Sequence, residues 1–252
     1  MTNSAASRQG SFADSQDEQA PGRRPGLVVA VDGPAGSGKS SAARGVARAL
    51  GLRYLDTGAM YRALTWWMLA RDIDTTSPEA VIEHARRPVI EVSTDPQAPV
   101  IRVDGIDVDG PIRSRAVSNA VSSVASIPQV RQHLIAMQRE IIARTVAAGG
   151  GIVAEGRDIG SVVAPDAAVK VFLTASEEVR AQRRSADLAA DPAVTAALTL
   201  QENARRDRRD APQTARAADA VEIDATGLGL DQVIGQIVSL ARGTRAGAAW
   251  TS

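Results

Sequence analysis

The sequence contains no cysteine, which excludes disulfide bonds, thiolate catalysis and zinc sites built on cysteine. Histidine is scarce: His84 and His133 are the only two, and we expect both on helices as structural or surface residues. No apolar run approaches the roughly 20 residues that a membrane-spanning helix needs. The formal net charge of zero argues against a general binder of nucleic acid or of anionic membranes.

Lysine is also rare, because the chain uses arginine for almost all of its positive charge. Of the 29 Lys and Arg residues, only Lys39 and Lys170 are lysines. Lysine presents a compact point charge, so a lone lysine in a polar motif is a candidate functional cation. Lys39 lies in such a motif, made of Gly33, Pro34, Ala35, Gly36, Ser37, Gly38, Lys39, Ser40 and Ser41.

This motif fills every fixed position of the phosphate-binding loop pattern G-x-x-x-x-G-K-[ST]. The apolar run 27–31 before it predicts a buried parallel strand, and the helical spacing after it predicts a helix that ends at Gly51. Backbone N–H groups and the positive end of the helix dipole would hold phosphate oxygens there. Lys39 is then positioned for the β- and γ-phosphates of a nucleotide, and the Ser40 hydroxyl for Mg²⁺.

A second polar cluster follows another short apolar segment and consists of Asp56, Thr57 and Arg62. We expect Thr57 to cap a helix, which places Arg62 near helix N–H groups and forms a second anion site. The alternative is a capping cluster with a surface arginine. A third polar run, 155–160, follows the strand predicted at 152–154 and reaches the carboxyl edge of a parallel sheet, where ligands bind.

Further along the chain, strands are predicted at 169–173 and 220–224, with a capping box from Thr174 to Glu177. The alternation of strands and helices predicts an α/β fold with a parallel sheet. Three short antiparallel strands predict an insert at about 87–127. The segment 183–210 is dense in Arg and Asp, as in a solvated charged face or a mobile lid over phosphates.

Two anion sites and an Arg-rich lid around one nucleotide loop suit phosphoryl transfer, which needs positioning and charge neutralisation rather than a protein nucleophile. The runs 32–39, 56–62, 155–160 and 165–167 resemble bacterial cytidylate kinases, nucleoside monophosphate kinases with a phosphate-binding loop. The resemblance covers about residues 27–240. It implies transfer of the ATP γ-phosphoryl group to CMP or dCMP with Mg²⁺. We also expect a cytoplasmic monomer that binds neither nucleic acid nor membrane.

The resemblance also implies roles for individual residues. Thr57 and Arg62, with Asp56, would contact the monophosphate. Ser122 and Arg131 would help to recognise cytosine. Arg157 would hold phosphate and Asp158 the base, while Arg206 and Asp210 in the lid would touch phosphate and ribose. The catalytic set would be Lys39, Arg157 and Arg206.

The resemblance and the composition together give a domain plan. We expect a disordered tail at 1–25, without the apolar stretch of a signal peptide, and one kinase domain at 26–242. That domain carries the monophosphate-binding insert at about 87–127 and the lid at about 183–217. Residues 243–252 form a second tail.

One departure from the family pattern falls in the lid, where Asp210 is followed by Ala-Pro-Gln instead of Ser-x-Arg. The third lid arginine is missing from its place, and Arg208, Arg209 or Arg216 could substitute for it. Two other functions stay open: a kinase for a different nucleotide or small metabolite, or a degenerate kinase kept as a binding module. Residues 107–110 match the D-x-x-G motif of GTP-dependent switches. Such a switch is nevertheless disfavoured, because the chain has no Asn-Lys-x-Asp motif for guanine.

Overall fold

A computed structural model describes residues 26–187, 205, 207–214 and 216–248. The main sheet has five parallel strands in the order β2-β6-β1-β7-β8. Their bounds are β1 Val28–Asp32, β2 Arg53–Asp56, β6 Ile152–Gly156, β7 Val169–Thr174 and β8 Val221–Asp224. Four of these strands were predicted from the sequence, whereas the segment that forms β2 was recognised only as a short apolar run. The α/β fold with a parallel sheet is therefore confirmed.

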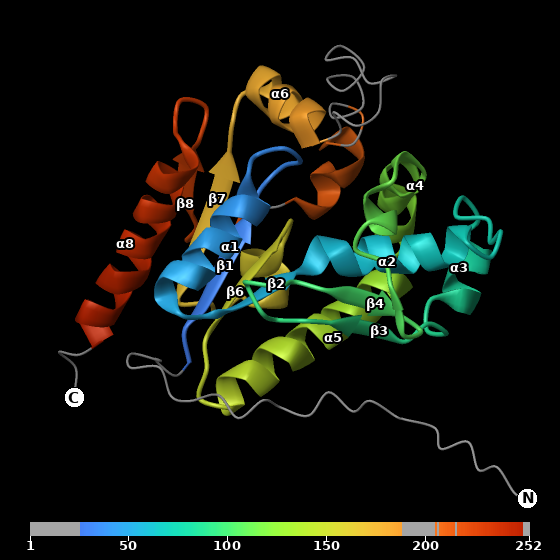
Figure 1. The fold of residues 1–252 in the computed structure, drawn as a ribbon, viewed down its shortest axis with the longest axis horizontal. Helices are drawn as coiled ribbons and strands as arrows, with labels where there is room; N and C mark the ends of the chain where they lie inside the picture. Colours follow the sequence, from blue (N-terminus) through green and yellow to red (C-terminus); the bar gives the residue numbers. More distant parts are fainter. Residues whose placement is uncertain (1–25, 188–204, 206, 215, 249–252) are drawn as a thin grey trace, which may run out of the picture.

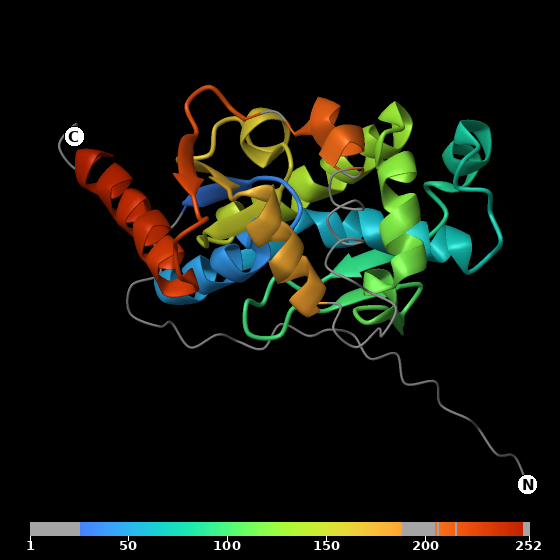
Figure 2. The same ribbon diagram turned by 90° about the horizontal axis from the view of Figure 1, so that it is seen from above.

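Helices cover both faces of this sheet, as Figures 1 and 2 show. On one face, α1 (Lys39–Leu50) and α8 (Leu230–Ala248) pack on a core that includes Val29, Val31 and Val171. On the other face, α2 (Thr57–Leu69) and α5 (Pro128–Ala147) pack on a core that includes Ala30 and Leu55. Alternate residues of β1 thus serve opposite faces, which explains its continuous apolar sequence.

The predicted insert forms a second, smaller layer beside the carboxyl end of the sheet (Figure 1). It holds an antiparallel sheet of β3 (Ile90–Val92), β4 (Ile101–Val103) and β5 (Ile106–Asp107), the 3-10 turn η1 (Pro111–Arg113) and helix α4 (Arg115–Ala125). Its core is shared with the distal half of α2, with α3 (Pro78–His84) and with the first half of α5. Long helices therefore tie the insert to the main sheet.

Of three expectations about helix starts and ends, two differ from the structure and one agrees with it. The capping box at Thr174 is wrong: Thr174 ends β7, and α6 (Glu177–Asp187) is capped by Ser176, whose Oγ accepts from the Val179 N–H at 3.4 Å. Gly51 does end α1, in a left-handed conformation with φ 63°. The last helix, α8, continues to Ala248, so residues 243–248 are helical rather than part of a tail.

The segment after β6 contains a helical turn that was not predicted from the sequence. Residues Ile159–Val163 form a single π-type turn, η2, in which the Ala164 N–H donates to the Ile159 carbonyl at 2.7 Å. A 3-10 turn, η3 (Ala211–Gln213), follows the short helical stretch 207–210. Among the helices described, none is long and apolar enough to cross a bilayer.

Candidate active site

The phosphate-binding loop lies between β1 and α1, in the strand–loop–helix context that the sequence predicted. Three of its glycines have positive φ, at 154° for Gly33, 75° for Gly36 and 90° for Gly38. At Gly33 a β-carbon would lie 2.1 Å from the carbonyl oxygen of Leu173, so a side chain is excluded by close approach of β7. The loop is consequently held tightly against the sheet, with its N–H groups at the start of α1.

Two arginines of α6 hold the tip of this loop from outside. Arg180 Nη1 donates to the Ala35 carbonyl at 3.2 Å, and Arg183 Nη1 donates to the Ser37 carbonyl at 3.1 Å. Arg180 also pairs with Asp207, so the lid and the loop share one buried cation. Arg183 lies in the segment 183–210, which was expected to be a charged face or a lid, whereas Arg180 was not singled out. Contacts between distant segments leave no local pattern in the sequence.

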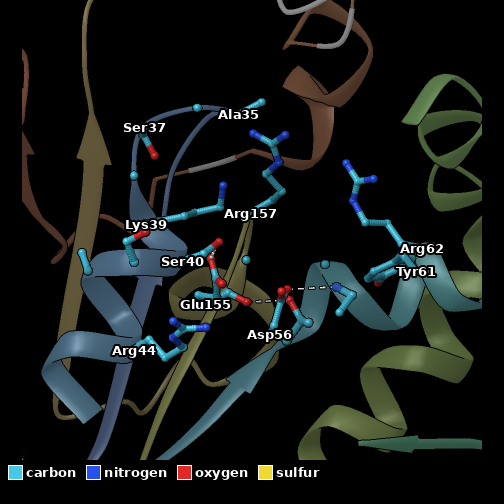
Figure 3. A pocket seen from close by; sticks show the side chains of 18 of the residues that line it. Ala35, Ser37, Lys39, Ser40, Arg44, Asp56, Tyr61, Arg62, Glu155 and Arg157 are labelled. Atoms are coloured by element: carbon cyan, nitrogen blue, oxygen red, sulfur yellow. Dashed lines mark hydrogen bonds between the residues drawn. The ribbon is translucent and has the colours of Figure 1, made fainter. Parts of the chain in front are cut away.

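Glu155 is fully buried at the end of β6 and joins α1 to β2. Its Oε2 accepts from the Ser40 hydroxyl at 2.9 Å, and its Oε1 accepts from the Tyr54 hydroxyl at 2.6 Å. Burial, with the nearby Asp56 carboxylate, raises the pKa of Glu155 to about 7, against the influence of Lys39 and these two hydrogen bonds. Figure 3 shows Glu155 between Ser40 and Asp56, below Lys39 and Arg157.

The start of α2 is capped by Asp56 rather than by Thr57, which corrects the sequence expectation. Asp56 has an extended backbone and its Oδ1 accepts from the Ala59 N–H at 2.9 Å. Thr57 is buried, and its hydroxyl donates to the Glu155 backbone carbonyl at 2.7 Å. Further along α2, Arg62 Nη1 donates to the Ile112 carbonyl and to Ser118 Oγ, which holds it against the insert.

A second set of charged groups lies near the loop and comes from α5, from the segment after β6 and from the lid. Arg131 on α5 forms an ion pair with Asp158, which is buried. Arg157 donates from Nη1 to the Gly33 carbonyl at 3.0 Å and from Nη2 to Asp210 at 2.8 Å. The other carboxylate oxygen of Asp210 accepts from Ser122 Oγ at 2.8 Å. Three distant segments of the chain thus meet at Asp210.

The lid is described only in part, and Arg206 lies outside the described residues. Arg205, Arg208 and Arg209 are exposed. Arg216 pairs with Glu222 of β8, away from the groups around Asp210. This pairing weakens the case for Arg216 as a substitute for the missing lid arginine.

One pocket of about 810 Å³ connects these groups. Its lining residues fall into two groups on either side of the phosphate-binding loop, and we call these groups its two arms. One arm runs toward the insert and is lined by Arg62, Ser122, Arg131, Arg157, Asp158 and Asp210. The other arm lies between the start of α1 and the segment after β8, and is lined by Arg183, Ala225, Leu228, Leu230 and Val233. The pocket therefore has room for two ligands that meet at Lys39.

The donor set beside Lys39 suits Mg²⁺, which prefers oxygen ligands and keeps several waters. The Ser40 hydroxyl and the Glu155 carboxylate lie together there, with Asp56 close enough to raise the Glu155 pKa. The described residues contain no group of three or more acidic or histidine side chains suited to a metal.

Comparison with known proteins identifies relatives along nearly the whole chain. The family model described as cytidylate kinase matches residues 29–243. A cytidylate kinase of Streptomyces griseus subsp. griseus is 50% identical over 226 residues, which are 89% of this chain and 96% of the relative. The cytidylate kinase of Streptomyces coelicolor is 51% identical over 224 residues, or 88% and 96% of the two chains. That of Rhodococcus opacus is 46% identical over 221 residues, or 84% and 93%.

Proposed function

The chain belongs to the cytidylate kinase family, and we propose from this how its residues transfer the γ-phosphoryl group of ATP to CMP or dCMP. The reaction gives ADP and CDP or dCDP. The observation that carries the residue assignment is the pocket with two arms, which meet at Lys39 and differ in polarity. The alternative of a kinase for another nucleotide or metabolite is disfavoured by the ion pair in the acceptor arm, whose donor and acceptor suit cytosine.

We assign ATP to the loop and to the apolar arm. The N–H groups of residues 33–41 and the N-terminus of α1 bind its phosphates. Leu228 and Leu230, with Arg183, offer a flat base an apolar and cationic surface in that arm. Lys39, whose Nζ donates to the Pro34 carbonyl at 3.2 Å, lies where β- and γ-phosphates would extend from the loop.

The Ser40 hydroxyl and the Glu155 carboxylate suit Mg²⁺ as the cofactor. Ser40 would be its protein ligand, and Glu155 would hold the Ser40 hydroxyl by a hydrogen bond. When bound, the ion neutralises charge on the phosphates of ATP. Because the Ser40 hydroxyl donates its proton to Glu155, its oxygen lone pairs are directed elsewhere and are available to a cation. Tyr54 steadies the same carboxylate from the opposite side, and burial raises the pKa of Tyr54, which keeps its hydroxyl a donor.

CMP occupies the polar arm. The cytosine edge presents an amine donor beside ring acceptors, and the Asp158 and Arg131 pair presents an acceptor beside donors. Uracil has a carbonyl acceptor in place of that amine, so the same pair disfavours UMP. Arg62 and Arg157 supply positive charge for the acceptor phosphate, and Ser122 and Asp210 offer hydrogen bonds to the nucleoside.

Catalysis needs no covalent intermediate. An oxygen of the CMP phosphate attacks the γ-phosphorus of ATP, and the bond to the bridging oxygen of ADP breaks. Lys39 and Arg157 approach the transferred group from opposite arms and stabilise the charge that spreads over it. Arg206 is assigned the same role from the lid, by resemblance to the family.

We also propose that the enzyme works as a monomer in the cytoplasm, without nucleic acid or membrane. A single chain supplies both arms of the pocket, and ATP and CMP are cytoplasmic metabolites. Sedimentation with and without both nucleotides tests the oligomeric state, and a dimer under assay conditions would contradict this proposal.

The assignment of Asp158 is tested by Asp158→Ala. Loss of the acceptor for the cytosine amine should raise the KM for CMP about ten- to a hundredfold and leave the KM for ATP within about twofold. The preference for CMP over UMP should fall in parallel. Asp109→Ala is a matched control, since Asp109 also lines the pocket but pairs with Arg113 on the surface. Equal increases in the KM for ATP and CMP would assign Asp158 to the fold instead.

A further inference from the structure

Asp32 is a buried carboxylate that the reaction, as assigned above, does not use. It is the last residue of β1, it is only 4% exposed, and the residues that line the described pocket do not include it. Both of its carboxylate oxygens are engaged by backbone donors. Oδ1 accepts from the Ile159 N–H at 2.7 Å, and Oδ2 accepts from the Gly160 N–H at 2.8 Å.

These two bonds reach across the sheet to the segment that carries Arg157 and Asp158. The backbone of Asp32 is paired in register with Gly156 on the neighbouring strand β6. Its side chain then holds the two residues after Asp158. Arg157 and Asp158 therefore form a two-residue bridge whose two ends are both fixed by the same residue.

The same residue is covalently joined to the phosphate-binding loop. Gly33 follows Asp32, and the Gly33 carbonyl accepts from Arg157 Nη1 at 3.0 Å. Movement of Asp32 would change the distance between the loop and the Arg157–Asp158 bridge. The geometry of Asp32 thus sets how the two nucleotide sites face each other.

We propose that Asp32 is a positioning residue for the acceptor nucleotide: by binding the Ile159 and Gly160 N–H groups it holds Arg157 and Asp158 in place for CMP. The proposal rests on the proposed roles of Arg157 and Asp158. An ionised carboxylate can accept both bonds at once, whereas an amide offers one acceptor oxygen and turns an NH₂ group toward the second N–H. No nucleotide contact by Asp32 itself is required.

The charge state of Asp32 gives this role a pH dependence. Burial raises the pKa of Asp32 to about 6, the Asp158 carboxylate adds to the increase, and the two N–H bonds and Lys39 oppose it. The other cation nearby is Lys170, whose side-chain carbons lie against Gly160 while its amine pairs with Asp219. Protonation below about pH 6 removes the negative charge and makes one carboxylate oxygen a hydroxyl, which is a weaker acceptor for an N–H.

The experiment compares Asp32→Asn with Asp224→Asn in the full chain. Asp224 is a matched control because it ends the parallel strand β8 and its carboxylate accepts from the N–H and the hydroxyl of Thr226, two residues later. Asp32→Asn should raise the KM for CMP at least about tenfold and leave the KM for ATP within about twofold. Asp224→Asn should change neither. An unchanged KM for CMP in folded Asp32→Asn, or equal increases for both nucleotides, would overturn the proposal.

A second measurement uses the unmodified protein and does not depend on how the variant folds. Cytidine carries no phosphate, so its binding avoids the titration that CMP shows near about pH 6. Calorimetry should show cytidine binding severalfold more weakly at about pH 5.5 than at about pH 7.5. Affinity that is flat over this range would count against Asp32.

The two assignments fail in different ways. If the acceptor site itself is misassigned, Asp158→Ala leaves the KM for CMP unchanged. If only the positioning role is wrong, Asp158→Ala raises that KM and Asp32→Asn does not.

Discussion

Replacing Glu155 by Gln should make the protein more stable and less active at the same time. Glu155 is fully buried between Ser40 and Tyr54, and its pKa is raised from 4.5 to about 7. A carboxyl group with a raised pKa binds its proton more tightly in the folded state. Its contribution to stability is therefore present below about pH 4.5 and is lost as pH rises to about 7.

The magnitude follows from the size of the pKa shift. A shift of about 2.5 pH units corresponds to about 3 kcal/mol at 1.36 kcal/mol per unit. Above pH 7 the folded wild-type protein bears this cost, whereas Glu155→Gln carries no charge. The Gln side chain can still hydrogen-bond both hydroxyl groups, because Ser40 and Tyr54 can each donate or accept.

The assay is urea unfolding without Mg²⁺ and with a chelator, at about pH 5 and about pH 8. The free energy of unfolding of Glu155→Gln should exceed that of wild type by about 3 kcal/mol at pH 8 and by less than about 1 kcal/mol at pH 5. With Mg²⁺ and both nucleotides, its kcat should fall by at least about a hundredfold. Glu91→Gln, on the exposed side of β3, is the control for loss of a carboxylate. A variant less stable than wild type at pH 8 would refute the reasoning.

Two further predictions concern the phosphate-binding loop. Lys39→Ala should lower kcat by orders of magnitude while the circular dichroism spectrum stays unchanged, because its charge acts mainly on the transferred phosphoryl group; Arg48→Ala, at the exposed end of the same helix, should keep near-normal turnover. Gly33→Ala should destabilise the protein by at least about 2 kcal/mol in urea unfolding and abolish ATP binding, because its β-carbon would overlap the Leu173 carbonyl. Gly51→Ala, where φ is also positive but the space is open, should cost only about 1 kcal/mol and leave activity intact.

The fold was largely predictable because its central strands, β1 and β6, are buried on both faces. Runs such as 27–31 and 152–154 are apolar throughout, and that pattern is typical of parallel strands covered by helices. The phosphate-binding loop was predictable for a different reason, since all of its contacts with phosphate come from consecutive residues. Local sequence carries both signals.

Caps and contacts between distant segments were harder to predict. Thr57 was expected to cap α2, but Asp56 lies one residue earlier, at the end of β2, and takes that position. Glu155 and Tyr54 meet only because β2 and β6 pair in one particular register, with Tyr54 opposite Val153 and Asp56 opposite Glu155. A single sequence does not contain the register, so the hydrogen bond between them had no local signal.

Three acidic residues lie at or next to the carboxyl ends of three adjacent parallel strands, at a site proposed to bind phosphates. Asp32 ends β1, Asp56 ends β2 and Glu155 lies next to the end of β6. Negative charge would repel a phosphate, yet each carboxylate accepts a hydrogen bond from a protein donor: the Ile159 and Gly160 N–H groups, the Ala59 N–H and the Ser40 hydroxyl. The acids therefore act on the groups around the nucleotides and not on the nucleotides themselves. The raised pKa values of Asp32 and Glu155 mean that their ionised carboxylates reduce the stability of the fold. Such a cost is expected where the carboxylates are needed to hold functional groups in position.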